Sequence, residues 1–204
     1  MLFDDKYRSI KNPAEGIFRD KGSKFIAYAH PVKTETEAKE ILSAIEAQHP
    51  KANHHCWALR LSPDRSVFRI NDDGEPSGTA GRPILNILLS NDLTNLVVVV
   101  VRYFGGTLLG VPGLINAYKL ATTDAIQAAE IIEKTVNDVY RIHFEYISMN
   151  DIMRLVKDLE LEIIKQSFEN SCILEVSIPK SKLNSALQKL DKIEQLSYTY
   201  LLTI

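Results

Sequence analysis

The polar segment formed by residues 71–83 carries the densest set of chemically versatile side chains in this sequence. Its thirteen residues include three carboxylates, two hydroxyls, three glycines and one arginine. Carboxylate oxygens are the ligands that Mg²⁺ prefers, so Asp73 or Glu75 could hold this ion beside a phosphate. A composition so rich in Gly, Ser, Thr and Asp is equally typical of a surface turn with solvated charges. The segment therefore indicates either a ligand site or a structural turn.

A second segment with chemical potential runs from Arg102 through residues 105–113, where four glycines precede or open a predicted helix. A helix start presents unpaired N–H groups and the positive end of the helix dipole, and glycines let the backbone approach a ligand closely. A phosphate fits this geometry, and Arg102 could bind it. The phosphate-loop pattern is nevertheless incomplete, because Val111 and Pro112 stand where Lys and Ser or Thr are required. A tight turn that lets the helix pack on a sheet explains these glycines equally well.

His54 and Cys56 lie two residues apart in a predicted strand, so their side chains share one face. Such a pair could be a nucleophile with its base, or half of a metal site completed by residues 72–75. Two positions on one strand cannot supply three converging ligands, and a lone strand cysteine is usually a small buried hydrophobe. We therefore predict no catalytic residue and no metal ion here. Cys56 and Cys172 fall in different predicted domains, which excludes a disulfide framework.

The strand that leads to Arg102 contains five consecutive valines, residues 97–101. A run with no polar face predicts a strand covered on both sides at the centre of a sheet, and Arg102 is expected to end the burial. Beyond the glycines, apolar residues recur at helical spacing from Leu114 to Ile132, which predicts a long helix.

The segments before this strand also carry secondary-structure signals. Their mixed order implies an α+β two-layer domain over residues 1–136, with the helices stacked on one sheet. The predicted elements are a strand pair turning at residues 21–24, a helix opened by a capping box at 34–37, strands at 52–61 and 67–71, and a helix at 83–90.

From about residue 137 apolar and polar residues alternate, which predicts a half-buried strand. Asn150 and Ser181 are expected to cap two helices. The resulting βαββαβ order predicts a ferredoxin-like C-terminal domain over residues 137–204, joined to the first domain by a short junction. The other predicted strands are residues 162–168, 172–178 and 196–202, with a turn at 169–171.

Length and composition limit the class of protein. A chain of 204 residues with 45% hydrophobic and 25% charged residues is typical of a folded soluble protein. It has no apolar run near the roughly 20 residues of a membrane span and no signal-peptide core, so we expect a cytoplasmic protein without a membrane partner. The net charge of −2 opposes strong nucleic-acid binding, which requires a basic surface.

Residues 72–83 (DDGEPSGTAGRP) and 101–110 (VRYFGGTLLG) resemble the two hallmark motifs of the IMPACT/YigZ family, and residues 22–27 and 53–58 resemble its lesser motifs. The resemblance implies a first domain with the fold of the second domain of ribosomal protein S5. It implies a second domain similar to the last domain of translation elongation factor G. It also implies a link to translation, because eukaryotic members are expected to restrain activation of the general amino-acid control kinase through a scaffold protein. Those members use an additional N-terminal domain that is not expected here.

Three roles remain open for the surface formed by these motifs. The first is a non-enzymatic regulatory protein that binds RNA, the ribosome or a translation factor, with bases stacking on Tyr103 or Phe104. The second is a small-molecule or nucleotide phosphate-binding protein or enzyme that uses the glycine-rich loop with Mg²⁺. The third is structural, with Arg102 paired to a carboxylate of residues 72–75.

We favour the first role over the second, because the residues expected of a phosphate-binding loop are missing. No resident cofactor is predicted. The residues predicted to bind a ligand or RNA are Ser23, Lys24, His54, Asp73, Glu75, Ser77, Thr79, Arg82, Arg102, Tyr103, Phe104, Gly105, Gly106, Thr107 and Gly110.

Overall fold

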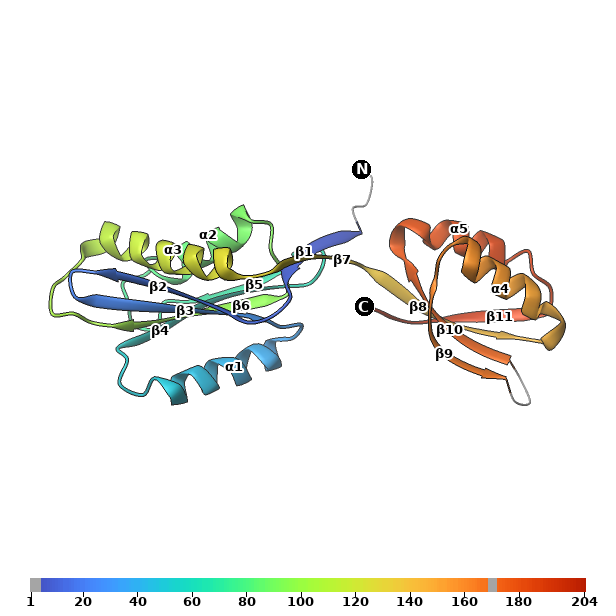
Figure 1. Ribbon diagram of the computed structural model, residues 1–204, viewed down its shortest axis with the longest axis horizontal. Coiled ribbons are helices and arrows are strands. Elements are labelled where there is room, and N and C mark those ends of the chain that lie inside the picture. Colours follow the sequence, from blue (N-terminus) through green and yellow to red (C-terminus); the bar gives the residue numbers. More distant parts are fainter. Residues whose placement is uncertain (1–4, 169–171) are drawn as a thin grey trace. The chain divides into compact units, whose positions relative to one another are not determined.

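The computed structural model describes residues 5–168 and 172–204, and within it the chain forms two units (Figure 1). The larger unit contains Tyr7–Lys134. The smaller unit contains the described residues of 135–204 together with Asp5 and Lys6. The turn predicted at residues 169–171 lies outside the described residues. No helix in the described part of the chain is long and apolar enough to cross a membrane.

A five-stranded antiparallel sheet forms the centre of the larger unit, in the order β2-β3-β6-β4-β5. The valine run lies in β6, the middle strand, as predicted. The β2–β3 hairpin turns at Lys21 and Gly22, whose φ angles of 44° and 80° suit a two-residue hairpin turn. The strands are β2 (Ala14–Asp20), β3 (Ser23–Pro31), β4 (His54–Leu61), β5 (Val67–Asn71) and β6 (Leu96–Tyr103).

Helices cover both faces of this sheet (Figure 1). On one face, α2 (Gly81–Ser90) and α3 (Gly110–Ala128) pack against Val98 and Val100. On the other, α1 (Glu35–Gln48) packs against the alternate valines of β6. The prediction of a two-layer domain is therefore wrong, because the helices form a layer on each face of the sheet. The valine run has no polar face, so both sides of β6 require an apolar cover.

Several helix boundaries differ from the predicted ones. Helix α3 ends at Ala128, and Ile131–Thr135 forms strand β7, which pairs with β1 (Lys6–Ile10). The predicted helix through Ile132 is wrong at its C-terminal end. Thr34 caps α1 as predicted, because its side chain accepts a hydrogen bond from the Glu37 N–H.

The smaller unit has the predicted βαββαβ order, with sheet order β11-β8-β10-β9 and the helices α4 and α5 on one face (Figure 1). Its elements are β8 (Asn137–Phe144), the short helix η1 (Tyr146–Ser148), α4 (Met149–Asp158), β9 (Glu162–Phe168), β10 (Cys172–Pro179), α5 (Lys180–Leu190) and β11 (Leu196–Thr203).

Both predicted caps of the smaller unit are wrong. Asn150 and Ser181 lie inside the first turns of α4 and α5. The Ser181 N–H instead donates to the Asp5 carboxylate at 2.9 Å, so a residue far away in the sequence caps α5. Hydrogen bonds to Ser181 lower the pKa of Asp5, since they stabilise its charged form.

Gly16 provides a test of how closely the helices approach the sheet. A Cβ atom at this position would lie 2.2 Å from the backbone nitrogen of Ala125 in α3. We expect Gly16→Ala to lower the free energy of unfolding by about 3 kcal/mol, because α3 must move away from β2. Urea unfolding followed by fluorescence of Trp57, the single tryptophan, reports on the larger unit.

Gly106→Ala is the matched control for this substitution. Its Cβ would meet no heavy atom within 4 Å, so only its φ of +86° opposes the change. We expect a loss of about 1 kcal/mol. An equal loss in the two variants would contradict the close contact between α3 and β2.

Candidate functional site

The side chain of Asp72 holds the polar segment of residues 71–83. Its Oδ1 accepts hydrogen bonds from the N–H groups of Ala80 (3.1 Å) and Gly81 (2.8 Å), and its Oδ2 accepts one from Gly78 (2.8 Å). These groups precede or open α2, where a helix leaves its first donors unpaired. Ala80, at the N-cap, has no polar side chain to cap the helix. Asp72 therefore supplies the cap and shapes the loop.

Glu75 and Arg102 form an ion pair inside the larger unit. Arg102 Nη1 lies 2.6 Å from Glu75 Oε1, and the Tyr118 hydroxyl donates to the same oxygen at 2.8 Å. The Glu75 and Arg102 side chains are 3% and 7% exposed. The prediction that Arg102 ends the burial of the valine strand is wrong, because a carboxylate partner compensates for burying its charge. The alternative of an internal pair with a carboxylate of residues 72–75 is confirmed.

Cys56 has the surroundings of a structural residue. Its thiol lies 3.0 Å from the Asp72 carbonyl oxygen and 3.2 Å from the Tyr118 hydroxyl. Burial raises the pKa of this thiol, so it stays protonated at neutral pH. A protonated thiol is a weak nucleophile, so the surroundings of Cys56 do not support cysteine catalysis.

His54 and Asp73 are also engaged by their neighbours. His54 Nδ1 donates to the Asp73 carbonyl oxygen at 2.7 Å, and its Nε2 lies 3.9 Å from Glu75 Oε1. The Asp73 carboxylate accepts the backbone N–H of His55 at 2.6 Å. Across residues 5–168 and 172–204, no three or more His, Cys, Asp and Glu side chains are grouped to hold a metal ion.

A cavity of about 480 Å³ lies at the start of α3, and we call it the α3 cavity. One part of its wall is polar and includes His54, Glu75 and Arg102. The rest is mostly apolar, with Leu108 81% exposed and Val111 51% exposed. A concave apolar surface with a few convergent polar groups is the usual form of a binding site. The full lining is Asn53, His54, Glu75, Pro76, Arg102, Phe104, Leu108, Leu109, Gly110, Val111 and Leu114.

The loop that forms the apolar rim is anchored at its start. The Phe104 N–H donates to Asn53 Oδ1 at 2.8 Å, and the Gly105 N–H donates to Ser23 Oγ at 3.1 Å. A Cβ on Gly105 would lie 1.9 Å from the carbonyl carbon of Gly22. Glycine is therefore required here for the close approach of two backbones.

The structure brings only some of the predicted site residues together. His54, Glu75, Arg102, Phe104 and Gly110 line the α3 cavity. Arg82 lines a separate hollow between α2 and α3. The other predicted residues that lie outside the cavity lining are Ser23, Lys24, Asp73, Ser77, Thr79, Tyr103, Gly105, Gly106 and Thr107.

Two of these residues have internal hydrogen bonds that account for their positions. Thr79 is buried and its hydroxyl donates to the Pro76 carbonyl oxygen at 2.6 Å. The Tyr103 hydroxyl lies 2.9 Å from His49 Nδ1, and the Tyr28 hydroxyl lies 2.7 Å from His49 Nε2. His49 thus joins the end of α1 to β3 and β6.

Sequence reasoning missed Leu108, Val111 and Tyr118 as parts of the site. The signal for Leu108 was available, because an apolar residue in a glycine-rich surface loop has no core to enter. Tyr118 was assigned to the core by helical spacing, and its ring is indeed buried. Its hydroxyl, however, requires a buried partner, and Glu75 provides it.

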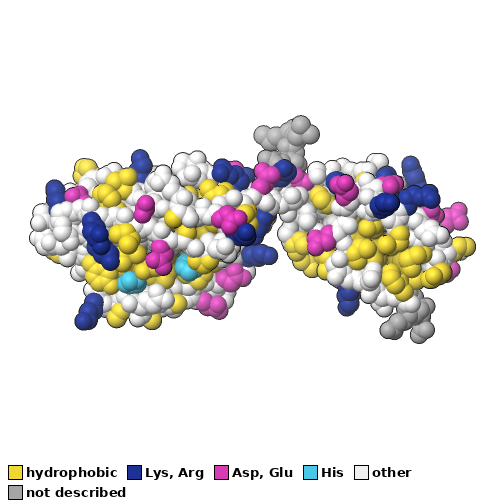
Figure 2. Space-filling view, in the orientation of Figure 1, with side chains coloured by type: hydrophobic (Ala, Val, Ile, Leu, Met, Phe, Trp, Pro, Cys, Tyr) yellow, Lys and Arg dark blue, Asp and Glu magenta, His cyan; other side chains and the backbone are white. Residues whose placement is uncertain are grey.

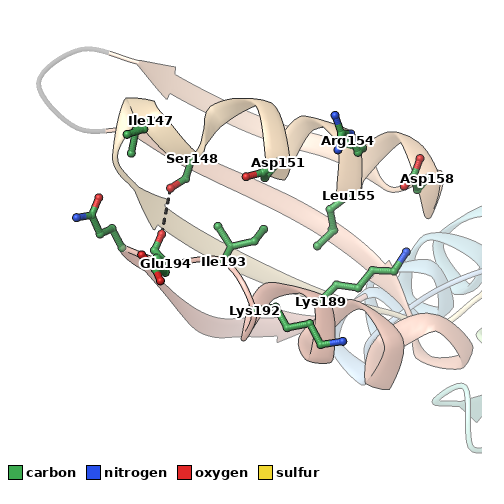
Figure 3. A pocket seen from close by; sticks show the side chains of 11 residues that line it. Ile147, Ser148, Asp151, Arg154, Leu155, Asp158, Lys189, Lys192, Ile193 and Glu194 are labelled. Carbon is green, nitrogen blue, oxygen red and sulfur yellow. Dashed lines mark hydrogen bonds between the residues drawn. The ribbon is translucent and has the colours of Figure 1, made fainter.

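A second hollow, of about 640 Å³, lies in the smaller unit between α4 and the end of α5 (Figure 3). Its lining combines basic residues such as Lys189 and Lys192 with acidic ones such as Asp151 and Asp158. The Ser148 hydroxyl donates to the Glu194 carbonyl oxygen across it at 3.0 Å. The two charge signs balance, so this hollow has no preference for an ionic ligand, and no predicted site residue lines it.

Comparison with known proteins places the chain in a family. The family model of the Impact N-terminal domain matches residues 21–126, which include every residue that lines the α3 cavity. This chain belongs to the IMPACT family. The IMPACT family member YigZ of Escherichia coli is 33% identical over 180 residues, covering 87% of this chain and 88% of the relative. The predicted family is thus confirmed.

Two further IMPACT relatives illustrate the extent of the likeness. The Protein IMPACT homolog of Saccharomyces cerevisiae is 35% identical over 94 residues, 45% of this chain and 36% of the yeast protein. A crystal structure described as that of a hypothetical protein has a TM-score of 0.71 and 29% identity, covering 97% of this chain and 98% of that one. The likeness to that structure therefore covers nearly the whole chain.

The ion pair yields a test of what holds the IMPACT motifs together. Arg102→Met leaves Glu75 buried without a counter-charge, and we expect a loss of about 3–5 kcal/mol in the free energy of unfolding. Glu75→Gln combined with Arg102→Met removes both charges and should lose less than Arg102→Met alone. Urea unfolding followed by Trp57 fluorescence measures both.

Arg69→Met is the matched control, because Arg69 pairs with Glu35 at 3.5 Å on the exposed surface. Its expected loss is below about 1 kcal/mol. Strictly additive losses from the Glu75→Gln and Arg102→Met substitutions would show that the two residues do not act as a pair.

His49 makes the stability of the larger unit depend on pH. Burial, with smaller contributions from His55 and Lys24, lowers the pKa of His49 below its ordinary value of about 6.5. Below that pH, His49 is protonated more readily in the unfolded chain than in the folded one. The free energy of unfolding therefore falls as pH falls. We expect His49→Gln to reduce the loss between pH 7.5 and 5.5, with His30, whose pKa is also lowered, contributing the remainder.

Urea midpoints measured by Trp57 fluorescence across this pH range provide the readout. His143→Gln removes an exposed histidine of the smaller unit and serves as the control. The same pH dependence in His49→Gln and wild type would rule out this role of His49.

Proposed function

We propose that this protein is a non-enzymatic, cytosolic regulatory protein linked to translation, and that the α3 cavity and its rim bind a translation factor. The link to translation comes from membership of the IMPACT family, whose eukaryotic members the resemblance associates with translation control. The observation that carries the choice of a protein partner is the apolar rim, formed by Phe104, Leu108 and Val111 beside a neutralised Arg102.

Burial of the apolar rim would stabilise a contact with a protein partner. Leu108 is 81% exposed, and burying a leucine side chain contributes about 1.5–3 kcal/mol. Large apolar side chains grouped at one exposed loop are typical of an interaction site. A partner side chain that enters the cavity would cover this loop and meet the polar wall at His54.

The electrostatics disfavour RNA as the occupant of the same cavity. Arg102, the predicted phosphate contact, already pairs with Glu75, so a phosphate would compete with a buried carboxylate. On the face of the larger unit drawn in Figure 2, basic and acidic side chains are interspersed. Nucleic-acid surfaces instead concentrate positive charge along one face.

The alternative of a phosphate-binding protein or enzyme with Mg²⁺ loses Glu75, one of the two carboxylates on which it depended. Glu75 is held by Arg102 and Tyr118, and the Asp73 carboxylate is held by the His55 N–H. Glu75 is therefore occupied by groups of the chain itself, whereas the Asp73 side chain is 46% exposed. The start of α3 also lacks the Lys and Ser or Thr of a phosphate-binding loop.

The proposal includes a fold for each unit. We assign the larger unit to the S5 domain 2-like class on the family resemblance, with helices on both faces of its sheet. We assign the smaller unit to the ferredoxin-like class, as in the last domain of elongation factor G. The support for the second assignment is its βαββαβ order and the sheet order β11-β8-β10-β9. Fold class by itself does not establish function.

Co-sedimentation with ribosomes tests the proposal. We compare ribosomes that carry their bound translation factors with ribosomes stripped of factors, across a salt series, using wild type and Leu108→Asp. We expect association with factor-bearing ribosomes that persists at high salt and decreases at least about tenfold in Leu108→Asp, since a buried leucine is worth more than 1.4 kcal/mol.

Leu120→Asp introduces the same change at an exposed position of α3 outside the cavity lining and should bind like wild type. Association that disappears with salt and ignores Leu108→Asp would indicate RNA and overturn the choice of a protein partner. Absence of association with either ribosome preparation would overturn the link to the ribosome.

A further inference from the structure

A groove between α2 and α3 is lined by two basic side chains and no acidic one, and we call it the α2–α3 groove. It has a volume of about 380 Å³ and is lined by Arg82 from α2 and Lys119 from α3. Both side chains are exposed, and among the described residues neither forms an ion pair or a side-chain hydrogen bond. No carboxylate lines the groove.

Four other arginines of the larger unit pair with carboxylates, among them the two with the shortest contacts. Arg65 lies 2.7 Å from Asp92, and Arg102 lies 2.6 Å from Glu75. A chain with a net charge of −2 has more carboxylates than cations, so two cations facing one groove without a carboxylate are a local excess of positive charge. This excess attracts an anionic ligand.

The remaining lining of the α2–α3 groove is apolar or neutral. Pro83 and Ile87 contribute buried apolar surface, and Ile115 of α3 is 39% exposed. Asn86 and Ser90 add an amide and a hydroxyl along α2. The groove can therefore accept an apolar side chain between anionic groups.

The absence of aromatic side chains from the described lining decides between two kinds of anionic polymer. Single-stranded nucleic acid gains much of its affinity from bases stacking on aromatic rings, and this groove offers none. A peptide needs only carboxylates near the two cations and an apolar side chain against Ile115. Charge complementarity together with this apolar surface favours the peptide.

We propose that the α2–α3 groove binds an acidic segment of a protein partner, with carboxylates of the segment on Arg82 and Lys119 and an apolar side chain on Ile115. This surface shares no lining residue with the α3 cavity. The two sites can be tested independently, and failure of one does not imply failure of the other.

Fluorescence anisotropy with a labelled twelve-residue peptide of Glu and Leu tests the inference in low salt. We expect saturable binding that weakens on the order of tenfold in the double variant Arg82→Glu/Lys119→Glu, because two attractive surface contacts become repulsive. Added salt should weaken peptide binding, because it screens the charges of Arg82 and Lys119. Ile115→Ser should weaken the peptide binding that remains at high salt.

The matched control is Lys33→Glu/Lys51→Glu, which makes the same charge change at exposed positions flanking α1. It should bind the peptide like wild type, as should Leu108→Asp. Thermal unfolding followed by Trp57 fluorescence must be the same in the groove variant and the control. This comparison separates loss of binding from loss of fold.

Three results would overturn the proposal. The first is no saturable binding of the Glu and Leu peptide to wild type. The second is an equal loss of affinity in the control variant. The third is tighter binding of an oligouridylate of the same length that depends on Arg82 and Lys119, which would make the groove a nucleic-acid site.

Discussion

The buried ion pair of Glu75 and Arg102 is the constraint on which the functional region depends. It joins three elements, because Glu75 belongs to the loop before α2, Arg102 to the central strand, and the Tyr118 hydroxyl reaches the same oxygen from α3. A charged pair this deeply buried is stable only if each member keeps its partner. The loop, the strand end and the helix therefore hold one arrangement, and that arrangement forms the polar wall of the α3 cavity.

This constraint also limits the chemistry of the region. Two of the candidate groups are engaged by the fold: burial raises the pKa of the Cys56 thiol, and one carboxylate oxygen of Asp73 accepts a backbone N–H. What remains free is mostly apolar surface around a rigid polar wall. A concave apolar surface with a few polar groups is the usual form of a binding site.

Elements with a local sequence signal were predicted correctly. Features that depend on a contact with a residue distant in the sequence were not. Five valines without a polar face identified the central strand, and the Thr34 capping box identified the start of α1. Arg102 was expected to end the burial of its strand, and its pairing with a carboxylate of residues 72–75 stayed one of three alternatives, because the partner lies 27 residues away. The cap of α5 was misread for the same reason, since Asp5 acts from outside the helix. Leu108 was overlooked because periodicity describes burial and says nothing of exposed apolar residues in loops.

The contact between Asp5 and Ser181 has a consequence for the topology of the chain. Asp5 and Lys6 belong to the smaller unit, residues 7–134 form the larger unit, and residues 135–204 form the rest of the smaller one. The smaller unit is thus discontinuous in sequence. During synthesis Asp5 is made long before α5. Its carboxylate can therefore cap α5 only after the ribosome has completed that helix. The smaller unit therefore cannot finish folding before the larger unit has been made.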